Sequence, residues 1–295
     1  MTMDVCEIVT KRIIEKLESG VVPWKKPWNG RGGATRWSVK KPYRGINALL
    51  LEPGEYASKK QIIKAGGRIN RDQLKNGHII VYWHWYKIKE EGQEDIPDDE
   101  ATYQKRAKPF YSRVWDINTQ CTGLKSKFND DDILDFNPIE KAEELISRYE
   151  DIPKIKNGPG GAYYIPALDI LNMPPVENFH SAEEYYSTLF HELVHSTGHD
   201  SRLNREGIIQ ISSFFGTDSY SKEELIAEMG SCMLSAMAGI DNSTIDNSAA
   251  YINGWLSKLK GDKRFIFSAA SQAQKAVDYM TGIAFEEEQR EEATA

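Results

Sequence analysis

The chain of 295 residues has few cysteines and no long apolar segment. Its three cysteines, Cys6, Cys121 and Cys232, are far apart and form neither a disulfide pattern nor a metal-binding pattern. No run of about 18 apolar residues is present, so we expect no membrane-spanning helix and no membrane partner. The first 20 residues are charged and amphipathic, and they lack the apolar centre of a secretory signal. Together these absences favour a protein of the reducing cytoplasm.

Charge is distributed unevenly along the chain, whose net charge is −7. Residues 1–128 carry 24 Lys and Arg against 15 Asp and Glu, a balance of +9, whereas residues 129–295 carry 13 against 29, a balance of −16. Six of the seven tryptophans lie in the basic part. A basic, Trp-rich half joined to an acidic half predicts two domains with different partners.

The first half reads as a mixture of helices and strands. Apolar residues at helical spacing predict a helix over residues 4–19 that Gly20 ends, and short helices are expected near Asn47 and ahead of Gly66. The β-branched and aromatic content of residues 78–88 and 109–117 predicts two strands, with the acidic segment 90–100 between them.

The second half is expected to be mainly helical, with a small sheet at its edge. Asn137 and Pro138 can begin a connecting helix, and "YYIPALDILNM" has strand-like residues. Further helices are expected over residues 181–197, 221–238, 248–259 and 264–280. The predicted fold class is therefore α+β, with these divisions: an N-terminal α+β domain over 1–128, a linker and connecting helix over 129–160, a mainly helical domain over 161–285 and an acidic tail over 286–295.

The stretch "YYSTLFHELVHSTGH" contains His-Glu-x-x-His. On a helix that Ser181 caps, His191, Glu192 and His195 share an arc of about 100°, so two imidazoles one turn apart can meet one metal ion. Glu192 is then placed to accept a proton from water at the metal without being a ligand. Coincidence is the alternative, but apolar residues fill the opposite side of the same helix, and this pattern favours a built site.

A catalytic zinc usually has three protein ligands, so one more is needed. The third His of the metzincin pattern is absent, because that position is Ser201. Glu224 and Glu228 lie four residues apart on a later expected helix, and we predict Glu224 as the ligand, with Glu228 as the alternative. Whichever is not the ligand can orient His191. Glu224 could also be structural, since Ser221-x-x-Glu224 is a capping box. His199 is expected to lie beyond the helix end rather than to bind metal.

Other groups could complete a cleft at this centre. Tyr163, Tyr164 and Tyr220 could stabilise an oxyanion, although packing is their simpler role. The strand-like segment after Gly161 could pair with an extended peptide substrate.

The basic half interleaves cations with aromatic rings, as proteins that bind single-stranded nucleic acid do. Core packing is the alternative, and we favour it for Trp83, Trp85 and Trp115, which lie in expected strands. The residues that we predict to contact single-stranded DNA lie in the loop and short helix before them: Trp24, Lys25, Lys26, Trp28, Arg36, Trp37, Lys41, Tyr43, Arg44 and Asn47.

Several longer stretches resemble the ArdC antirestriction family. They include "SGVVPWKKPW", "KPYRGINALLL" and "VWDINTQCTGL" in the first half, and "YYSTLFHELVHSTGHDSRLNR" and "YSKEELIAEMGSCML" in the second. The resemblance implies an N-terminal domain that binds single-stranded DNA and a C-terminal zincin-like metallopeptidase domain. It also implies a mobile-element protein that shields incoming DNA from host restriction, and a glutamate ligand at the position of Glu224.

Three functions follow as hypotheses. The first is an antirestriction protein that binds single-stranded DNA and carries a peptidase-type domain with zinc, or another divalent metal such as Mn²⁺. The second is a regulatory metalloprotease that cleaves a restriction-system protein or another protein, with DNA serving only for recruitment. The third is a binding module with a structural metal, which the position of Glu192 argues against because a structural site needs no base.

Overall fold

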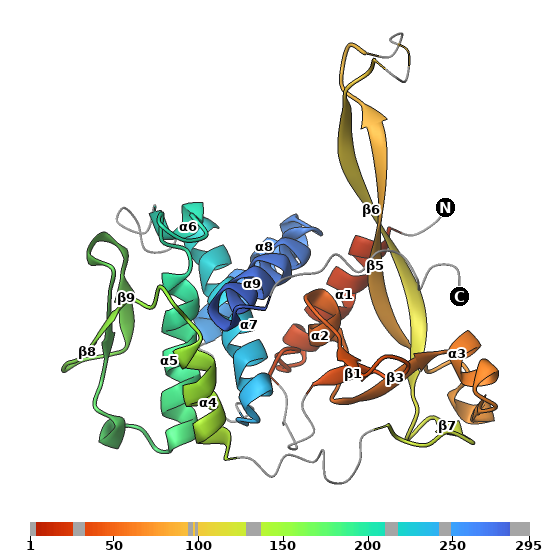
Figure 1. Cartoon of the computed structure of the whole chain (residues 1–295), viewed down its shortest axis with the longest axis horizontal. Helices are drawn as coiled ribbons and strands as arrows, with labels where there is room; N and C mark the ends of the chain where they lie inside the picture. The colour runs from red at the N-terminus through yellow and green to blue at the C-terminus, as the bar shows by residue number, and fades with distance from the viewer. Residues whose placement is uncertain are drawn as a thin grey trace.

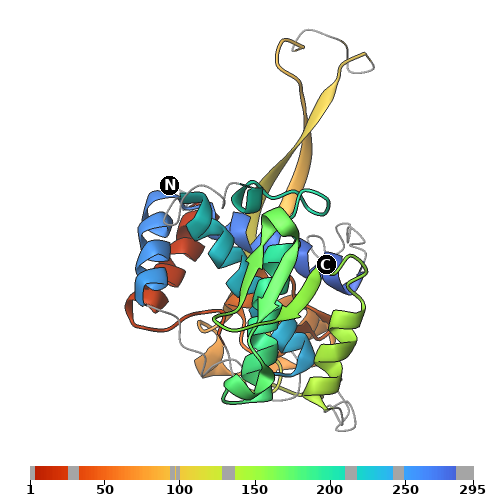
Figure 2. The same cartoon turned by 90° about the vertical axis from the view of Figure 1, so that its left-hand side faces the viewer.

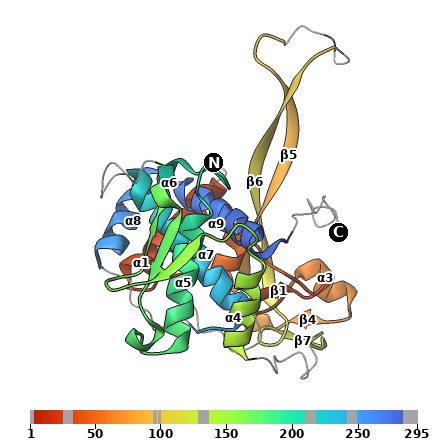
Figure 3. The same ribbon diagram turned by 60° about the vertical axis from the view of Figure 1, so that its left-hand side comes forward.

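The structure is a computed structural model, and it describes residues 4–25, 33–93, 97, 100–127, 137–209, 218–241 and 249–283. A helical part with a small sheet on its outer side lies beside a part built around a second sheet (Figure 1). A long two-stranded ribbon projects from this second part, away from the rest of the molecule (Figures 1 and 3). The predicted α+β fold class is confirmed.

The helical part forms from the second half of the chain, as predicted. Its helices are α4 (Pro138–Ser147), α5 (Ala182–Ser196), α6 (Glu206–Ile209), α7 (Asp218–Ala238), α8 (Ala249–Gly261) and α9 (Phe265–Thr281). In its small sheet, β10 (Ile170–Met173) lies between β8 (Lys154–Asn157), which is parallel to it, and β9 (Tyr163–Ile165), which is antiparallel. This sheet covers the outer side of α5 (Figure 2). Two short 3-10 helices, Pro166–Leu168 and Val176–Asn178, lie next to its strands.

The described residues of the first half form three α-helices: α1 (Val5–Glu18), α2 (Ile46–Leu50) and α3 (Lys59–Lys64). Its main sheet has the order β2-β1-β3-β6-β5, with strands β1 (Ala34–Arg36), β2 (Lys41–Pro42), β3 (Gly54–Ser58), β5 (His78–Lys89) and β6 (Tyr103–Asp116). Two short strands, β4 (Arg68–Ile69) and β7 (Cys121–Thr122), form a separate two-stranded sheet in this half, which also contains a 3-10 helix, Arg71–Gln73. Asp4 caps α1, and Gly20 follows the helix with φ +81°, the conformation that ends a helix most readily at glycine.

The largest hydrophobic core draws on both halves of the chain. The apolar face of α1 packs against α8, and α2 packs against α9. Trp24, which follows α1, is 1% exposed, and its ring meets the ring of Trp255 edge-on with centroids 5.5 Å apart. The same core includes Leu193 of α5 and Met229 of α7. The charge boundary near residue 128 therefore does not divide the hydrophobic core.

The ribbon of β5 and β6 differs from our expectation in two respects. β6 begins six residues earlier than predicted, because its residues pair with β5 as far as Tyr103 opposite Lys89. We expected Trp83 and Trp85 in the core, but their exposed fractions are 41% and 52%, so this prediction is wrong. Strand content alone does not tell whether a second layer covers a strand, and along this ribbon the two strands extend beyond the sheet. Trp115, nearer the sheet, is buried as expected.

Among the described residues, every helix is too short or too polar to cross a lipid bilayer.

Candidate metal centre

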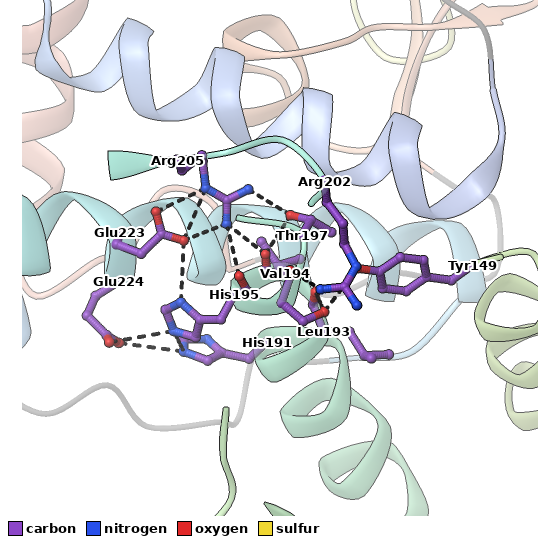
Figure 4. A network of polar contacts seen from close by, with 11 residues as sticks. Tyr149, His191, Leu193, Val194, His195, Thr197, Arg202, Arg205, Glu223 and Glu224 are labelled. Carbon is purple, nitrogen blue, oxygen red and sulfur yellow. Dashed lines mark hydrogen bonds and ion pairs between the residues drawn. The ribbon is translucent and has the colours of Figure 1, made fainter. Parts of the chain in front are cut away.

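Helix α5 carries both histidines of the motif in its last two turns. Its first turn is fixed by Ser181, whose hydroxyl accepts a hydrogen bond from the Glu184 backbone N–H over 3.2 Å. The Glu184 carboxylate accepts one from the His180 N–H over 2.8 Å. Phe190 and Leu193 are fully buried in the core. Because this apolar face sets the rotation of the helix, both imidazoles are directed toward α7 (Figure 4).

Three side chains converge on one point. The Nε2 atoms of His191 and His195 lie 3.1 Å apart, and the Glu224 carboxylate of α7 lies 3.6 Å from the first and 3.5 Å from the second. Ligand atoms at about 2.0–2.1 Å from a tetrahedrally coordinated ion lie roughly 3.3 Å from one another. His191, His195 and Glu224 are also the group of potential ligands in the described residues whose donor atoms all lie within 4.8 Å of one another. The donor set and its spacing fit a divalent transition metal.

Each imidazole has a second carboxylate at its other nitrogen. Glu228 Oε2 lies 3.7 Å from His191 Nδ1, and Glu223 Oε1 lies 3.5 Å from His195 Nδ1. A carboxylate at Nδ1 favours the tautomer with hydrogen on Nδ1, which leaves Nε2 free to bind a metal. Three glutamates of a single helix therefore face the two imidazoles: Glu224 at both Nε2 atoms, and Glu228 and Glu223 each at one Nδ1.

The charges at the site shift the pKa of two of these groups. Burial alone would lower the pKa of His191, but the contacts with Glu224 and Glu228 outweigh it and hold that pKa well above the ordinary value. Burial would raise the pKa of Glu223, but Arg205 and His195 hold it below the ordinary value. Glu223 therefore remains a carboxylate able to accept from His195.

Arg205 fixes Glu223 in place. Its Nε donates to both carboxylate oxygens, over 3.0 and 3.2 Å, and its Nη1 donates to the Thr197 hydroxyl over 2.7 Å (Figure 4). Its Nη2 donates to the Val194 carbonyl over 2.8 Å. The guanidinium thus ties α7 to the end of α5. A Cβ at Gly198 would lie 2.5 Å from Cγ1 of Ile208 and 2.9 Å from Nη2 of Arg205, so glycine at this position makes room for both side chains.

A second glycine sets the distance between the two helices that carry the three converging side chains. A Cβ at Gly230 of α7 would lie 2.8 and 2.9 Å from the two methyl groups of Val194 of α5. Real Cβ atoms do not approach so closely, so α5 and α7 lie nearer to each other than alanine would permit. This close approach brings Glu224 to the histidines.

The small sheet is tied to the end of α5 by a second arginine. Arg202 donates to both oxygens of Asp169, over 2.8 and 2.7 Å, and to the Ser196 carbonyl over 3.0 Å. The Tyr164 hydroxyl of β9 donates to the same Asp169 over 2.7 Å. β9 is consequently held beside the helix that carries both histidines, and in the described residues its outer edge pairs with no other strand.

Lys25 lies at this centre rather than on a DNA-binding surface. Its Nζ is 3.5 Å from Glu228 Oε1, and the two side chains are only 9% and 15% exposed. Because Glu228 also faces His191, a residue of the basic half belongs to the surroundings of the metal ligands. This position contradicts our prediction that Lys25 contacts a DNA phosphate.

The other predicted residues of this centre are placed as follows. Glu192 is buried at 8% exposure, next to His191 on α5. His199 lies beyond the helix, where its Nδ1 is 2.8 Å from the Ser201 hydroxyl, outside the group of three. Tyr163 is 46% exposed on β9, and the side chain of Tyr220 lies outside the described residues.

Most of the residues predicted to bind DNA have structural partners. Trp24 is wrong as a stacking residue, because a ring buried against Trp255 has no free face. The Asn47 amide both donates to and accepts from the Val81 backbone over 2.7 Å. Arg44 forms an ion pair with Asp278 of α9.

The remaining members of that set are less constrained. Trp37 donates through Nε1 to the Lys125 carbonyl, and Lys127 lies 4.6 Å over its ring. Tyr43 meets Tyr56 edge-on, Arg36 is half-buried in β1, and Lys41 is exposed in β2. Lys26 and Trp28 lie outside the described residues.

Sequence reasoning missed the roles of Glu223 and Arg205. Glu223 lies between the two residues of the expected capping box, Ser221 and Glu224. That it faces His195 could be known only from the rotation of α7 about its axis. Arg205 lies ten residues beyond His195, and no spacing rule connects the two. The one available signal was Gly198, which marks a close approach of other atoms to the backbone.

Comparison with known proteins agrees with both halves of the chain. Residues 3–115 match the N-terminal domain of anti-restriction factor ArdC, and residues 140–272 match the zincin-like metallopeptidase family. DNA primase TraC of Escherichia coli is 32% identical over 306 residues, which cover 98% of this chain but only 28% of TraC. Protein y4eC of Sinorhizobium fredii (strain NBRC 101917 / NGR234) is 29% identical over 94% of this chain and 91% of its own length.

Two crystal structures of the antirestriction protein ArdC from plasmid R388 are similar over nearly the full length. The metal-free structure is 32% identical, with a TM-score of 0.72, and the match covers 94% of this chain and 97% of that one. The Mn(II)-bound structure is 33% identical, with a TM-score of 0.71, over 95% and 98% of the two chains. With both halves matched and the whole fold shared, this chain belongs to the ArdC antirestriction family.

Proposed function

We propose that this chain is an antirestriction protein of a mobile genetic element that binds single-stranded DNA and carries a metal-dependent peptidase centre. The observation that carries the proposal is the convergence of His191, His195 and Glu224 in a chain whose basic half matches the ArdC N-terminal domain. Family membership supports the antirestriction role, and the charge of residues 1–128 supports binding to a polyanion.

His191, His195 and Glu224 would hold the metal. Zinc is our default, because two imidazoles and a carboxylate are its usual ligands in peptidases. A relative of the same fold has been crystallised with Mn(II), and the same donors accept several divalent metals. When bound, the metal would polarise the peptide carbonyl and acidify water at the site.

The residues of the chain would carry out the remaining steps. Glu192, one position beyond the first histidine, would accept a proton from the attacking water and pass it to the departing amine. Glu228 and Glu223 would hold the two imidazoles in the orientation that presents Nε2. An extended peptide would add to the unpaired edge of β9, beside α5, through backbone hydrogen bonds. The peptide would belong to a restriction-system protein or to another protein met during DNA transfer.

A second candidate is a regulatory metalloprotease for which DNA serves only as a means of recruitment. It is supported by the presence in one site of a potential ligand set, a base and two orienting carboxylates. The two candidates differ in what Glu192 must do. In the first, protection of DNA depends on binding and survives without the base. In the second, protection depends on cleavage.

The test compares the full-length protein with its Glu192→Gln and His191→Ala variants. Metal content, affinity for single-stranded DNA, and survival of unmodified DNA introduced into restricting cells are measured for each. We expect Glu192→Gln to keep the metal, DNA affinity and protection, and His191→Ala to lose the metal. Loss of protection in Glu192→Gln at unchanged DNA affinity would favour the regulatory protease. Absence of protection by the wild-type protein would overturn the proposal.

A further inference from the structure

The distal part of the β5–β6 ribbon, which we name the arm, comprises residues 82–89 and 103–110. Near the body, β6 also pairs with β3, where Ser58 lies opposite Val114. Beyond that point β5 and β6 pair with each other alone among the described strands, from Tyr82 opposite Phe110 to Lys89 opposite Tyr103. At its base, the Trp83 ring meets the Phe267 ring of α9 edge-on with centroids 6.0 Å apart. Farther along, the arm extends away from the helices and the sheet (Figures 1 and 3).

The arm is uniformly basic. Its sixteen residues include five cations and no acidic residue, and the cations are Lys87, Lys89, Lys105, Arg106 and Lys108. Seven of the 15 acidic residues of the first half fall instead between residues 90 and 100, which connect the two strands of the arm. The balance of +9 for residues 1–128 therefore understates how positive the arm itself is.

The arm also exposes an unusual number of aromatic rings. The exposed fractions are 39% for Tyr82, 41% for Trp83, 52% for Trp85, 40% for Tyr86 and 38% for Phe110. A soluble protein rarely leaves such a series of large rings in water unless they bind something.

Strand register arranges rings and cations alternately. Residues directly opposite each other share a face, so one face carries the pairs Tyr82–Phe110, His84–Lys108 and Tyr86–Arg106. The Tyr82 and Phe110 rings are stacked with centroids 5.8 Å apart, and Lys108 lies 5.7 Å over the Phe110 ring. Successive pairs on this face are about 6.8 Å apart, two residues at about 3.4 Å each.

We propose that the arm is the surface on which single-stranded DNA lies, with its exposed rings stacked on unpaired bases and its five cations next to phosphates. This inference rests on the proposed function and gives it a location. Charge complementarity selects a polyanion, and exposed rings select a nucleic acid whose bases have free faces. A second protein strand fits less well, because lysines along a strand edge oppose sheet extension. In the described part of residues 24–47, Trp24 is buried, the Lys25 side chain is 9% exposed beside Glu228, and Asn47 is bonded to Val81.

The experiment uses the full-length protein and a fluorescent 20-nucleotide oligothymidine, with anisotropy measured over a series of salt concentrations. The ring variant is Trp85→Ala with Tyr86→Ala, and the charge variant replaces Lys87, Lys105, Arg106 and Lys108 by Gln. Trp85→Phe keeps a stacking ring. The matched controls lie on the small sheet: Tyr163→Ala, a ring of similar exposure, and Lys154→Gln with Lys156→Gln, two exposed cations.

We expect the ring variant to bind at least about tenfold more weakly with little change in salt dependence, because stacking releases no counterions. The charge variant should reduce the log–log salt slope by about 0.7 for each phosphate that it no longer neutralises. Trp85→Phe and both controls should bind like the wild type. All variants should keep the wild-type melting temperature and metal content, since the arm lies outside the core.

Unchanged affinity in both arm variants, with a wild type that binds, would overturn the arm as the binding surface and leave the proposed function intact. A preference of the wild type for duplex DNA over the single strand would overturn the stacking mode. A wild type that binds no DNA would remove this inference together with the DNA-binding part of the proposed function.

Discussion

At the scale of single residues, the proposed metal centre depends on the positions of three glutamates of α7. Glu224 lies next to both Nε2 atoms, whereas Glu223 and Glu228 each lie next to one Nδ1. The proposed ligand and the two orienting groups are all glutamate carboxylates, so only their positions distinguish their roles. Removing a ligand takes away a bond to the metal, but removing an orienting group only weakens the preference for the right tautomer.

The expected order of metal affinities follows from these positions. Glu224→Gln should lose stoichiometric metal, whereas Glu223→Gln and Glu228→Gln should each bind about 10–100-fold more weakly than the wild type. Competition with a chelator of known affinity measures all three. Glu177→Gln, an exposed acid on the surface, should leave affinity unchanged. If Glu228→Gln strips the metal while Glu224→Gln retains it, the assignment of ligand and orienting group is reversed.

The contact of Asp169 with Arg202 predicts a pH effect on stability. Burial would raise the pKa of Asp169, but the hydrogen bonds from Arg202 and Tyr164 outweigh it and lower that pKa below its ordinary value. Its stabilisation is therefore present above the unfolded pKa, about 3.9, and is lost as pH falls through the lower folded pKa. Asp169→Asn, which tolerates the observed φ of +49°, should lower the melting temperature at pH 7.

The difference between Asp169→Asn and the wild type should shrink as pH falls below about 4. Thermal unfolding at a series of pH values tests this, with Asp200→Asn, whose side chain is 74% exposed, as the control. A difference that stays constant or grows at acid pH would show that the Asp169 carboxylate does not supply the stabilisation.

At the scale of elements, the spacing of α5 and α7 decides whether the ligands meet. Gly230→Ala should force the two helices apart at Val194 and cost about 1–3 kcal/mol of the free energy of unfolding. It should also weaken metal binding, since Glu224 moves with α7. The double variant Val194→Ala with Gly230→Ala removes the colliding methyl groups and should recover metal affinity.

Gly254→Ala on α8 is the matched control for this prediction. The nearest atom to its new Cβ lies 3.9 Å away, so alanine fits there and should be neutral or stabilising. Denaturant unfolding and metal titration provide both readouts. Normal metal affinity in Gly230→Ala would mean that the helix spacing tolerates the extra methyl group.

The same scale shows what the sequence could and could not predict. Helices with a cap, a periodic apolar face and a glycine stop were found within a few residues, because those signals are local: α1 and α5 are examples. The exposure of Trp83 and Trp85 was missed, since whether a strand is covered depends on elements distant in the chain. At the metal site, helical spacing was enough to nominate two histidines, but the ties of Glu223 to His195 and Arg205 needed the packing of α7 on α5.

At the scale of the whole molecule, one core unites two halves of opposite charge. α1 and Trp24 belong by sequence to the basic half, yet they fill the core beside α8 and Trp255. A protein cut between residues 128 and 137 should therefore remain assembled when both pieces are produced together. Each piece alone should lose solubility, because it exposes the apolar surface that the other covers.

Trp24→Ala should weaken this reassembly strongly, since removing a buried tryptophan costs about 3–5 kcal/mol. Copurification of the two pieces measures it, and Trp85→Ala, a ring on the exposed arm, is the matched control. Two pieces that separate freely, each with a cooperative unfolding transition of its own, would show that the shared core is dispensable.

The shared core also constrains how such a gene can be inherited. A recombination event that joined either half to a foreign sequence would expose the apolar surface around Trp24 or the face of α8 that contacts α1. We expect its product to be insoluble. We therefore expect the two halves to pass between genomes as one block. The match with TraC has this form, since 98% of this chain aligns within 28% of that longer protein.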